Sequence, residues 1–257
     1  MAERGNIMGQ YYRPIVTQNG ITTLFNNRTA LMTEEDKTHQ ASDSYYNYHG
    51  LKITEHSWWE NSLVKGVIGR LYNKKGRVAW IGDYSDDEAF ASDDVPTPLS
   101  PRELYAGNMF ARKPDGSFAK DERGYVIELE NEPLPSNIKK YRGWVRYNPN
   151  FTLNNKIIIN LTRKEYIECN AYYKRSIDDD GWCLNPLPLL TSTGGDRGGG
   201  DYHSGYICAN EVGRWAYDEI IIKDSSPARL SKLEKDGFIE LKVIFNESRQ
   251  IPVQGVV

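Results

Sequence analysis

The sequence lacks the long apolar runs, cysteine frameworks and secretion signals that mark several protein classes. No stretch approaches the roughly 18 consecutive apolar residues that span a bilayer, and residues 1–9 contain no apolar core of a signal peptide. The 3 cysteines are widely spaced and form no Cys-x-x-Cys pair, which argues against structural zinc and disulfides. We therefore expect a cytoplasmic protein without a membrane segment.

Familiar catalytic motifs are also missing. The chain has no Gly-x-Ser-x-Gly elbow and neither of the glycine patterns that mark P-loops and dinucleotide-binding folds. Only 4 histidines occur, so a histidine-rich metal site is not expected, and a formal charge of −3 does not indicate a nucleic-acid partner. These absences leave open whether the chain is an enzyme, and they identify no cofactor.

Aromatic residues are abundant, with 17 tyrosines and 6 tryptophans. Such side chains suit the half-buried surface of a β-sheet. Residues 10–17 and 21–25 flank Asn19-Gly20, which predicts a hairpin. Further strands are predicted at residues 77–82, 124–129, 156–161, 165–170, 212–222 and 237–245. A tight turn at residues 160–163 would join the strands at 156–161 and 165–170 in a second hairpin. A helix is predicted at residues 58–72, where apolar side chains recur at helical spacing behind a capping box formed by Ser57 and Glu60.

These patterns predict one α+β domain over residues 1–257, β-rich and mostly antiparallel, with one main amphipathic helix. Residues 85–136 are hydrophilic and rich in turns, which is typical of an irregular insertion or lid. Two small β domains joined near residues 133–141 are the alternative. Residues 184–190 contain two prolines, so we expect neither an ordinary strand nor a helix there, whereas residues 227–235 predict a short helix.

The most unusual stretch is residues 194–205, which contains six glycines. The backbone N–H groups of such a segment can hold a phosphate. Its arginine and tyrosine suit a contact with a partner, and its aspartates and histidine are of the types that bind metals or transfer protons. A flexible, exposed loop of turns is the plainer alternative. The candidate site residues here are Asp196, Arg197, Asp201, Tyr202 and His203.

Two Trp-x-x-Asp segments, residues 80–83 and 215–218, could converge on the glycine-rich segment. In a strand, a tryptophan and an aspartate at this spacing lie on opposite faces. His56 stands just before the predicted helix and could present a ring nitrogen to a ligand, although a hydrogen bond to a backbone carbonyl is the plainer alternative. We add His56, Asp83, Trp215 and Asp218 to the candidate site; coincidence is the alternative for the pair of segments.

Several short blocks resemble an uncharacterised family of proteins from bacteria and their phages or mobile elements. The blocks are Met8-Gly-Gln-Tyr-Tyr, Glu55-His-Ser-Trp, Val78-Ala-Trp-Ile-Gly-Asp-Tyr, Asn160-Leu-Thr-Arg-Lys-Glu-Tyr-Ile, Arg197-Gly-Gly-Gly-Asp-Tyr and Gly213-Arg-Trp-Ala-Tyr-Asp-Glu-Ile. The Arg197 block is the most specific, and Tyr217 departs from the pattern because a glycine is expected there. The resemblance implies no activity and no catalytic roles.

Two functions are consistent with these features. The first is an intracellular binding or interaction protein, encoded by a phage or mobile element and acting on host machinery, because tyrosine, tryptophan and arginine dominate interface hot spots. The second is an enzyme or binder of a nucleotide-like or other anionic small molecule at the glycine-rich segment, with or without a metal. The expected partner is accordingly a protein or an anionic small molecule.

Overall fold

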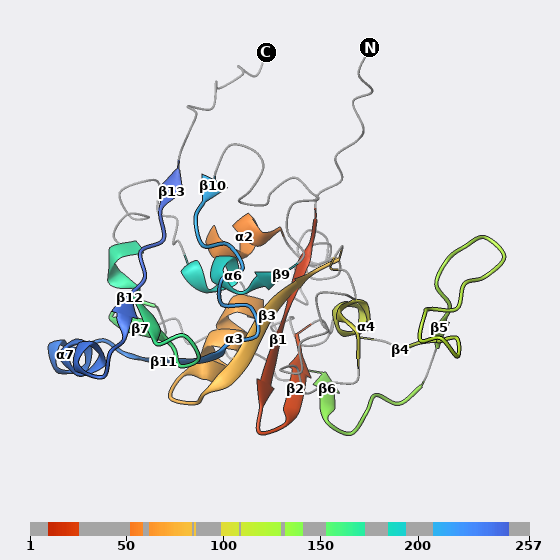
Figure 1. Ribbon diagram of the computed structural model, residues 1–257, viewed down its shortest axis with the longest axis horizontal. Coiled ribbons are helices and arrows are strands. Elements are labelled where there is room, and N and C mark those ends of the chain that lie inside the picture. The colour runs from red at the N-terminus through yellow and green to blue at the C-terminus, as the bar shows by residue number, and fades with distance from the viewer. Residues whose placement is uncertain are drawn as a thin grey trace, which may run out of the picture.

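A mixed β-sheet runs through the part of the protein that the computed structural model describes (Figure 1). The described residues are 10–25, 52–58, 62–83, 85, 99–107, 109–129, 132–140, 153–172, 185–193 and 208–246. Within them the sheet has nine strands: β1 (Tyr12–Gln18), β2 (Ile21–Leu24), β3 (Gly76–Gly82), β6 (Ile138–Lys140), β7 (Lys156–Asn160), β8 (Glu165–Glu168), β9 (Ser192–Thr193), β11 (Glu219–Asp224) and β12 (Ile239–Glu240). Their order is β12-β8-β7-β11-β3-β1-β2-β6, and β9 pairs with β3.

Most strand pairs are antiparallel. The parallel pairs of this sheet are β2 with β6, β3 with β9 and β8 with β12. Two smaller antiparallel pairs join β4 (Met109–Phe110) to β5 (Glu128–Leu129) and β10 (Cys208–Ala209) to β13 (Phe245–Asn246). A large, mostly antiparallel sheet accompanied by a few short helices confirms the predicted α+β class.

Two predicted hairpins are present. β1 and β2 are joined by Asn19 and Gly20, whose φ angles of 51° and 73° are the left-handed values that a tight hairpin turn requires. The hydroxyls of Thr17 and Thr22 lie 2.8 Å apart across the pair. β7 and β8 form the second hairpin, with Ile158 opposite Ile167.

Five helices accompany the sheet in the described residues: α2 (Ile53–Trp58), α3 (Ser62–Leu71), α4 (Pro101–Ala106), α6 (Pro186–Leu190) and α7 (Pro227–Lys235). The helix predicted at 58–72 is found as α3, and α7 matches its prediction. Ser57 lies inside α2, so the predicted capping box, in which Ser57 precedes a helix, is wrong. Because α3 has 10 residues and α7 has 9, the structure does not single out one main helix.

Helix α6 corrects the expectation that two prolines would exclude a helix from residues 184–190. Asn185 caps α6, and its side-chain oxygen accepts a hydrogen bond from the backbone N–H of Leu187 at 3.0 Å. Pro186 and Pro188 both fall in the first turn, where the backbone N–H groups have no partner within the helix. Proline therefore removes no helical hydrogen bond at these two positions.

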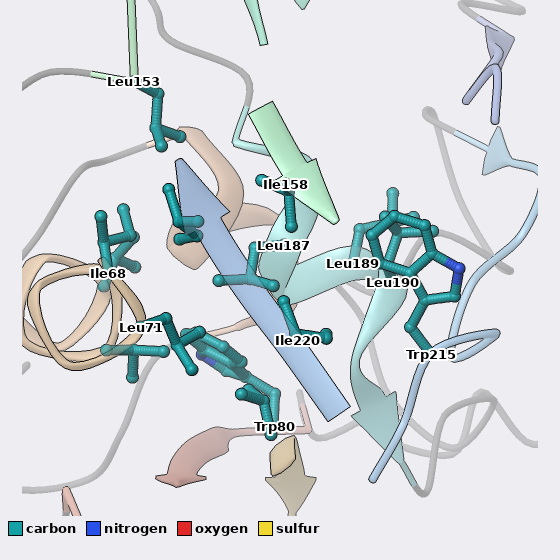
Figure 2. Close-up of a cluster of buried hydrophobic side chains, with 14 of the residues drawn as sticks. Ile68, Leu71, Trp80, Leu153, Ile158, Leu187, Leu189, Leu190, Trp215 and Ile220 are labelled. Atoms are coloured by element: carbon teal, nitrogen blue, oxygen red, sulfur yellow. The ribbon is translucent and has the colours of Figure 1, made fainter. Parts of the chain in front are cut away.

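The larger hydrophobic core lies on the face of the sheet that α2, α3 and α6 cover (Figure 2). Helix α3 buries one stripe of apolar side chains against the strands. Figure 2 shows Ile68 and Leu71 of this helix, together with Leu187 of α6, around Ile220 of β11. Burying one such side chain stabilises the fold by about 1.5–3 kcal/mol. This core therefore holds the three helices against the sheet.

The opposite face carries two smaller cores. Leu104 of α4 packs with Ile15 and Ile81, which belong to β1 and β3. Leu233 of α7 packs with Ile157 of β7 on the same face, beyond β11. Since side chains alternate along a strand, β1 and β3 present one set of residues to α2 and α3 and the other set to α4.

Two strand predictions near the C-terminus need correction. The strand expected at 212–222 begins only at Glu219, and Trp215 lies in the turn that precedes it. Gly213 and Tyr217 have φ angles of 72° and 64°, so the backbone cannot be a continuous strand there. The strand expected at 237–245 is divided into β12 and β13, and residues 241–244 between them belong to neither.

Residues 109–129, which we call the arm, extend away from the sheet on the side opposite α7 (Figure 1). The arm lies within the segment predicted as an insertion or lid; whether it moves as a lid stays a prediction. Its base is the β4–β5 pair. Two short hairpins follow, closed by antiparallel bridges between Arg112 and Phe118 and between Lys120 and Val126.

The arm repeats itself with a period of eight residues. Residues 111–118 read ARKPDGSF, and residues 119–126 read AKDERGYV. The glycines of the two units, Gly116 and Gly124, have φ angles of 83° and 85°. Backbone hydrogen bonds of 2.7, 3.0 and 3.0 Å close a ring at the common junction, from Ala119 to Ala111, from Ile127 to Ala119 and from Ala111 to Ile127. The arm is therefore held together largely by its own backbone.

Candidate functional site

The nine predicted site residues divide into two groups. Asp196, Arg197, Asp201, Tyr202 and His203 lie outside the described residues. His56, Asp83, Trp215 and Asp218 are described, and each has defined contacts. The first two lie at the end of the sheet where β1 begins and where β3 and β9 end. The other two lie in and just after the turn that precedes β11.

His56 lies on α2 and is completely buried. Its Nε2 is 3.0 Å from the carbonyl oxygen of Tyr12. A carbonyl only accepts, so Nε2 carries the proton and Nδ1 does not. Burial lowers the pKa of His56 to about 4, although the hydrogen bond to Tyr12 opposes that shift. The ring also meets that of Trp80 edge to face, with centroids 6.1 Å apart. His56 is therefore a neutral imidazole at pH 7, fastened between α2 and the start of β1.

Asp83 follows the last residue of β3. Its carboxylate accepts a hydrogen bond from the backbone N–H of Tyr11 at 3.1 Å, and its own N–H donates to the Tyr11 carbonyl at 2.9 Å. The negative charge of Asp83 contributes to the raised pKa of Tyr105, which belongs to α4. His56 contacts the core on the α2 face, whereas Asp83 acts on the α4 face. The structure thus brings the two to one end of the sheet but not to one surface.

On the α4 face, Arg13 and Tyr105 form a half-buried pair. The Arg13 guanidinium lies 4.5 Å from the centre of the Tyr105 ring, and its Nη1 donates to the Tyr105 carbonyl at 2.9 Å. Burial raises the pKa of Tyr105 to about 12; the charge of Arg13 opposes this shift and that of Asp83 adds to it. The planar guanidinium is thereby oriented next to an aromatic ring, an arrangement that suits anions and flat ligands.

This pair lies near the point where the chain enters the glycine-rich segment. Thr193, the last residue of β9, is opposite Ile81 of β3. Its carbonyl accepts a hydrogen bond from the hydroxyl of Ser85 at 2.9 Å. Burial raises the pKa of Tyr217, whose phenol also interacts with the side chain of Thr193. Thr193, the last described residue before the glycine-rich segment, therefore lies at the same end of the sheet as Arg13 and Asp83.

Trp215 and its neighbour Arg214 share one carboxylate. The indole N–H of Trp215 donates to Glu165 at 2.7 Å, and Arg214 donates to both oxygens of Glu165 at 2.5 and 3.1 Å. Burial raises the pKa of Glu165, but the hydrogen bonds from Arg214 and Trp215 outweigh it, and the net pKa is lowered. Trp215 thus fastens the turn before β11 to the start of β8.

Asp218 is buried and also holds the turn before β11 in place. Its Oδ2 accepts hydrogen bonds from Asn160 Nδ2 at 2.8 Å and from Arg163 Nε at 2.6 Å. These donors come from the end of β7 and the turn between β7 and β8. Asp218 therefore joins the turn before β11 to that hairpin, and its carboxylate is occupied by structural contacts.

The arm offers a surface that the sequence motifs did not indicate. The side chains of Tyr125 and Ile127 are 70% and 40% exposed. Both follow Gly124, the left-handed glycine of the second hairpin. The eight-residue repeat was the available signal, but a repeat of two units is short and its apolar positions are few. Sequence reasoning therefore assigned the segment to an irregular insertion.

The base of the arm is anchored by one buried carboxylate. Glu103 of α4 is 1% exposed and accepts hydrogen bonds from the backbone N–H groups of Ser100 and Phe110, at 2.8 and 3.3 Å. It also accepts one from Arg112 of the arm at 2.8 Å. Glu103 thus caps α4 and orients the arm in the same set of contacts.

Comparisons with known proteins add no relative. Among the described residues, no group of three or more histidine, cysteine, aspartate or glutamate side chains is placed to hold a metal ion. None of the described helices has both the length and the apolar character needed to cross a membrane. No family model, no curated protein and no solved structure matches the chain.

Proposed function

We propose that the protein acts by binding another protein and that the arm supplies a contact surface. The observation that carries this proposal is the exposure of Tyr125 and Ile127, at 70% and 40%, on a segment that extends away from the sheet. Only two other large apolar side chains in the described residues are strongly exposed, Ile239 and Ile244. Tyrosine buries a large area in an interface at a low cost in side-chain entropy.

The arm makes hydrogen bonds within itself that define its shape. Asp121 accepts hydrogen bonds from the backbone N–H groups of Arg123 and Tyr125, at 2.9 and 2.8 Å, which shapes the hairpin that presents Tyr125. In the first hairpin, Asp115 accepts a hydrogen bond from the N–H of Ser117 at 2.9 Å. A surface that is already ordered loses less entropy on binding. The arm therefore suits a partner with a matching apolar pocket.

The glycine-rich segment belongs to the same proposal. Arg197 and Tyr202 are residue types that dominate interface hot spots, and the family resemblance suggests a phage or mobile element as the source. We infer a cytoplasmic protein that contacts host proteins through this segment and the arm. The support for this part is the sequence pattern.

Affinity capture from host-cell lysate, with quantitative mass spectrometry, is the first test. We would compare the wild type with Tyr125→Ser/Ile127→Ser and with Arg197→Ala/Tyr202→Ala. Ile239→Ser/Ile244→Ser is the matched control, because it removes an exposed apolar pair from another part of the chain. A captured protein would then be purified and its Kd measured. We expect at least tenfold weaker binding for the first two variants only; equal binding by all four proteins would contradict the proposal.

A second candidate function is binding, or enzymatic conversion, of a nucleotide-like or other anionic small molecule. The observation that favours it is the oriented guanidinium of Arg13 on the ring of Tyr105, close to the start of the glycine-rich segment. Thermal-shift measurements with nucleotides, with and without divalent ions, test it. Arg13→Ala should abolish a shift that Lys232→Ala retains. Absence of any shift with the wild type would exclude this function.

A further inference from the structure

Three exposed asparagines, Asn19, Asn73 and Asn155, share an unusual backbone conformation. Their φ angles are 51°, 58° and 56°, in the left-handed region that asparagine accepts more readily than most residues. They differ in the residue that follows. Asn73 and Asn155 each precede a lysine, whereas Asn19 precedes Gly20 in the turn between β1 and β2, and no other asparagine of the sequence precedes a glycine.

The surroundings of Asn19 and Gly20 are open. Both residues are exposed, and a Cβ atom added at Gly20 would meet nothing within 4 Å. The side chain of Asn19 makes no hydrogen bond to the described residues. Asn155 differs in this respect, because its Oδ1 accepts a hydrogen bond from Nδ2 of Asn170 at 3.1 Å. The carboxamide of Asn19 is therefore accessible to water and held by no partner.

An asparagine followed by glycine can react with its own backbone. Base removes the proton from the glycine N–H, and the nitrogen forms a bond with Cγ of the asparagine. The bond between Cγ and Nδ2 then breaks, and Nδ2 leaves as ammonia. Water opens the resulting cyclic imide at either carbonyl, which yields aspartate or isoaspartate. The reaction needs only base and water, and glycine favours it because no side chain crowds the attacking nitrogen.

We propose that Asn19 is a modification site, where the folded protein converts spontaneously to aspartate and isoaspartate through a cyclic imide with the backbone nitrogen of Gly20. The site involves neither the arm nor the glycine-rich segment, so it stands whether or not these regions bind a partner. The two products differ in their backbones. Aspartate keeps the original chain path, whereas isoaspartate routes the chain through the side chain and adds a methylene group to the turn.

The β1–β2 hairpin has no room for a longer turn. Gln18 pairs with Ile21 across two turn residues, and the turn requires left-handed φ angles at both. Nε2 of Gln18 also donates to the carbonyl oxygens of Arg70 and Lys75, at 3.0 and 3.1 Å, which fastens the hairpin to the connection between α3 and β3. An extra methylene group would displace Gln18 from these contacts. Isoaspartate at this position should therefore destabilise the fold, whereas aspartate should not.

The first test follows the three asparagines in one sample. The purified protein is incubated at pH 6 and at pH 8, and peptide mapping with mass spectrometry distinguishes asparagine, aspartate and isoaspartate at each site. We expect Asn19 to convert at least tenfold faster than Asn73 and Asn155, because only its neighbour lacks a side chain. Conversion should be faster at pH 8, since the attacking nitrogen is deprotonated. Equal or slower conversion at Asn19 would overturn the proposal.

A second measurement tests whether the folded hairpin reacts. The rate at Asn19 is measured again in urea, and the fraction of unfolded protein in buffer is taken from the unfolding curve. A rate in buffer above the product of these two values supports reaction in the folded state, and a rate equal to that product would overturn it.

The isoaspartate form, separated by ion exchange, is then compared with Asn19→Asp, which represents the other product. We expect a lower Tm for the isoaspartate form only. Equal Tm values would overturn the predicted distortion of the hairpin.

Discussion

Trp80 and Trp215 lie in the same hydrophobic core, each three residues before an aspartate, but they are held differently (Figure 2). Trp215 lies in a turn, and its indole N–H donates to Glu165. Trp80 lies in β3, and its indole N–H has no partner among the described residues. The three-residue spacing is therefore shared, whereas the element and the hydrogen bonding are not. A short motif of this kind specifies a buried aromatic ring but not its polar surroundings.

Removing the carboxylate of Glu165 should have the largest effect on the free energy of unfolding. Glu165→Ala leaves the buried indole N–H of Trp215 and the guanidinium of Arg214 without their acceptor. We expect the free energy of unfolding to fall by about 3–4 kcal/mol. Because the pKa of Glu165 is lowered in the folded protein, the loss should be complete at neutral pH and smaller below pH 4.5. Chemical denaturation over a pH series measures both quantities.

Glu211→Ala is the matched control for that change. Glu211 also pairs with Arg214, at 2.8 Å, but at a more exposed position. Its removal should cost less than about 1 kcal/mol. If the two variants were equally destabilised, the buried hydrogen bond from Trp215 to Glu165 would add nothing beyond an ion pair with Arg214.

The free energy of unfolding should depend on pH because of His56, the buried histidine beside Trp80. His56, which contacts Trp80, stays neutral down to a pKa of about 4 when folded and takes up a proton near 6.5 when unfolded. The unfolded state therefore binds more protons between these pH values, and the free energy of unfolding should fall by about 3 kcal/mol as pH drops from 6.5 to 4.

His56→Gln supplies the comparison, because glutamine keeps a donor for the Tyr12 carbonyl but does not titrate. The difference in unfolding free energy between wild type and variant should shrink steadily over this pH range. A constant difference would show that His56 is already charged in the folded protein.

Replacing each indole by phenylalanine tests the comparison directly. Both changes remove similar apolar area, but only Trp215→Phe removes a hydrogen bond to a carboxylate. We expect Trp215→Phe to lower the free energy of unfolding by about 1–2 kcal/mol more than Trp80→Phe. Urea titrations of the two variants in parallel measure this difference. Equal losses would mean that the bond to Glu165 adds nothing beyond burial.

The smallest difference in the free energy of unfolding is expected between alanine variants of the two aspartates, Asp83 and Asp218. Asp218→Ala leaves the buried amide of Asn160 and the guanidinium of Arg163 without this acceptor, whereas Asp83→Ala removes the acceptor of the backbone N–H of Tyr11. We expect Asp218→Ala to be about 1 kcal/mol more destabilising. Thermal unfolding of both variants at pH 7 measures this difference. A larger loss for Asp83→Ala would reverse the ranking.

Local signals in the sequence predicted local structure well. Asn19-Gly20 predicted the β1–β2 hairpin because few residues accept two left-handed positions in succession. The β7–β8 hairpin and α7 were also predicted with nearly correct ends. Prolines misled the prediction of α6, because their effect depends on where in a helix they fall.

The candidate site depended on contacts that a sequence pattern does not encode. His56 and Asp83 reach the same end of the sheet, but strand alternation and the positions of α2 and α4 direct them to different faces. The arm was assigned to an insertion because its two repeat units carry few apolar residues. Its exposed Tyr125 and Ile127 stand out only once most other large apolar side chains of the described residues are seen to be buried.

The sequence by itself determined the α+β class, the hairpins and two of the five described helices, α3 and α7, because these follow from interactions between residues close together in the chain. Only the tertiary structure decided what each buried polar group meets. Trp215 and Glu165 are 50 residues apart in sequence yet 2.7 Å apart in space, and Ser57 meets Asn185 from a distant helix. Hydrogen bonds depend on distances of a few tenths of an ångström, and packing of the whole chain sets those distances.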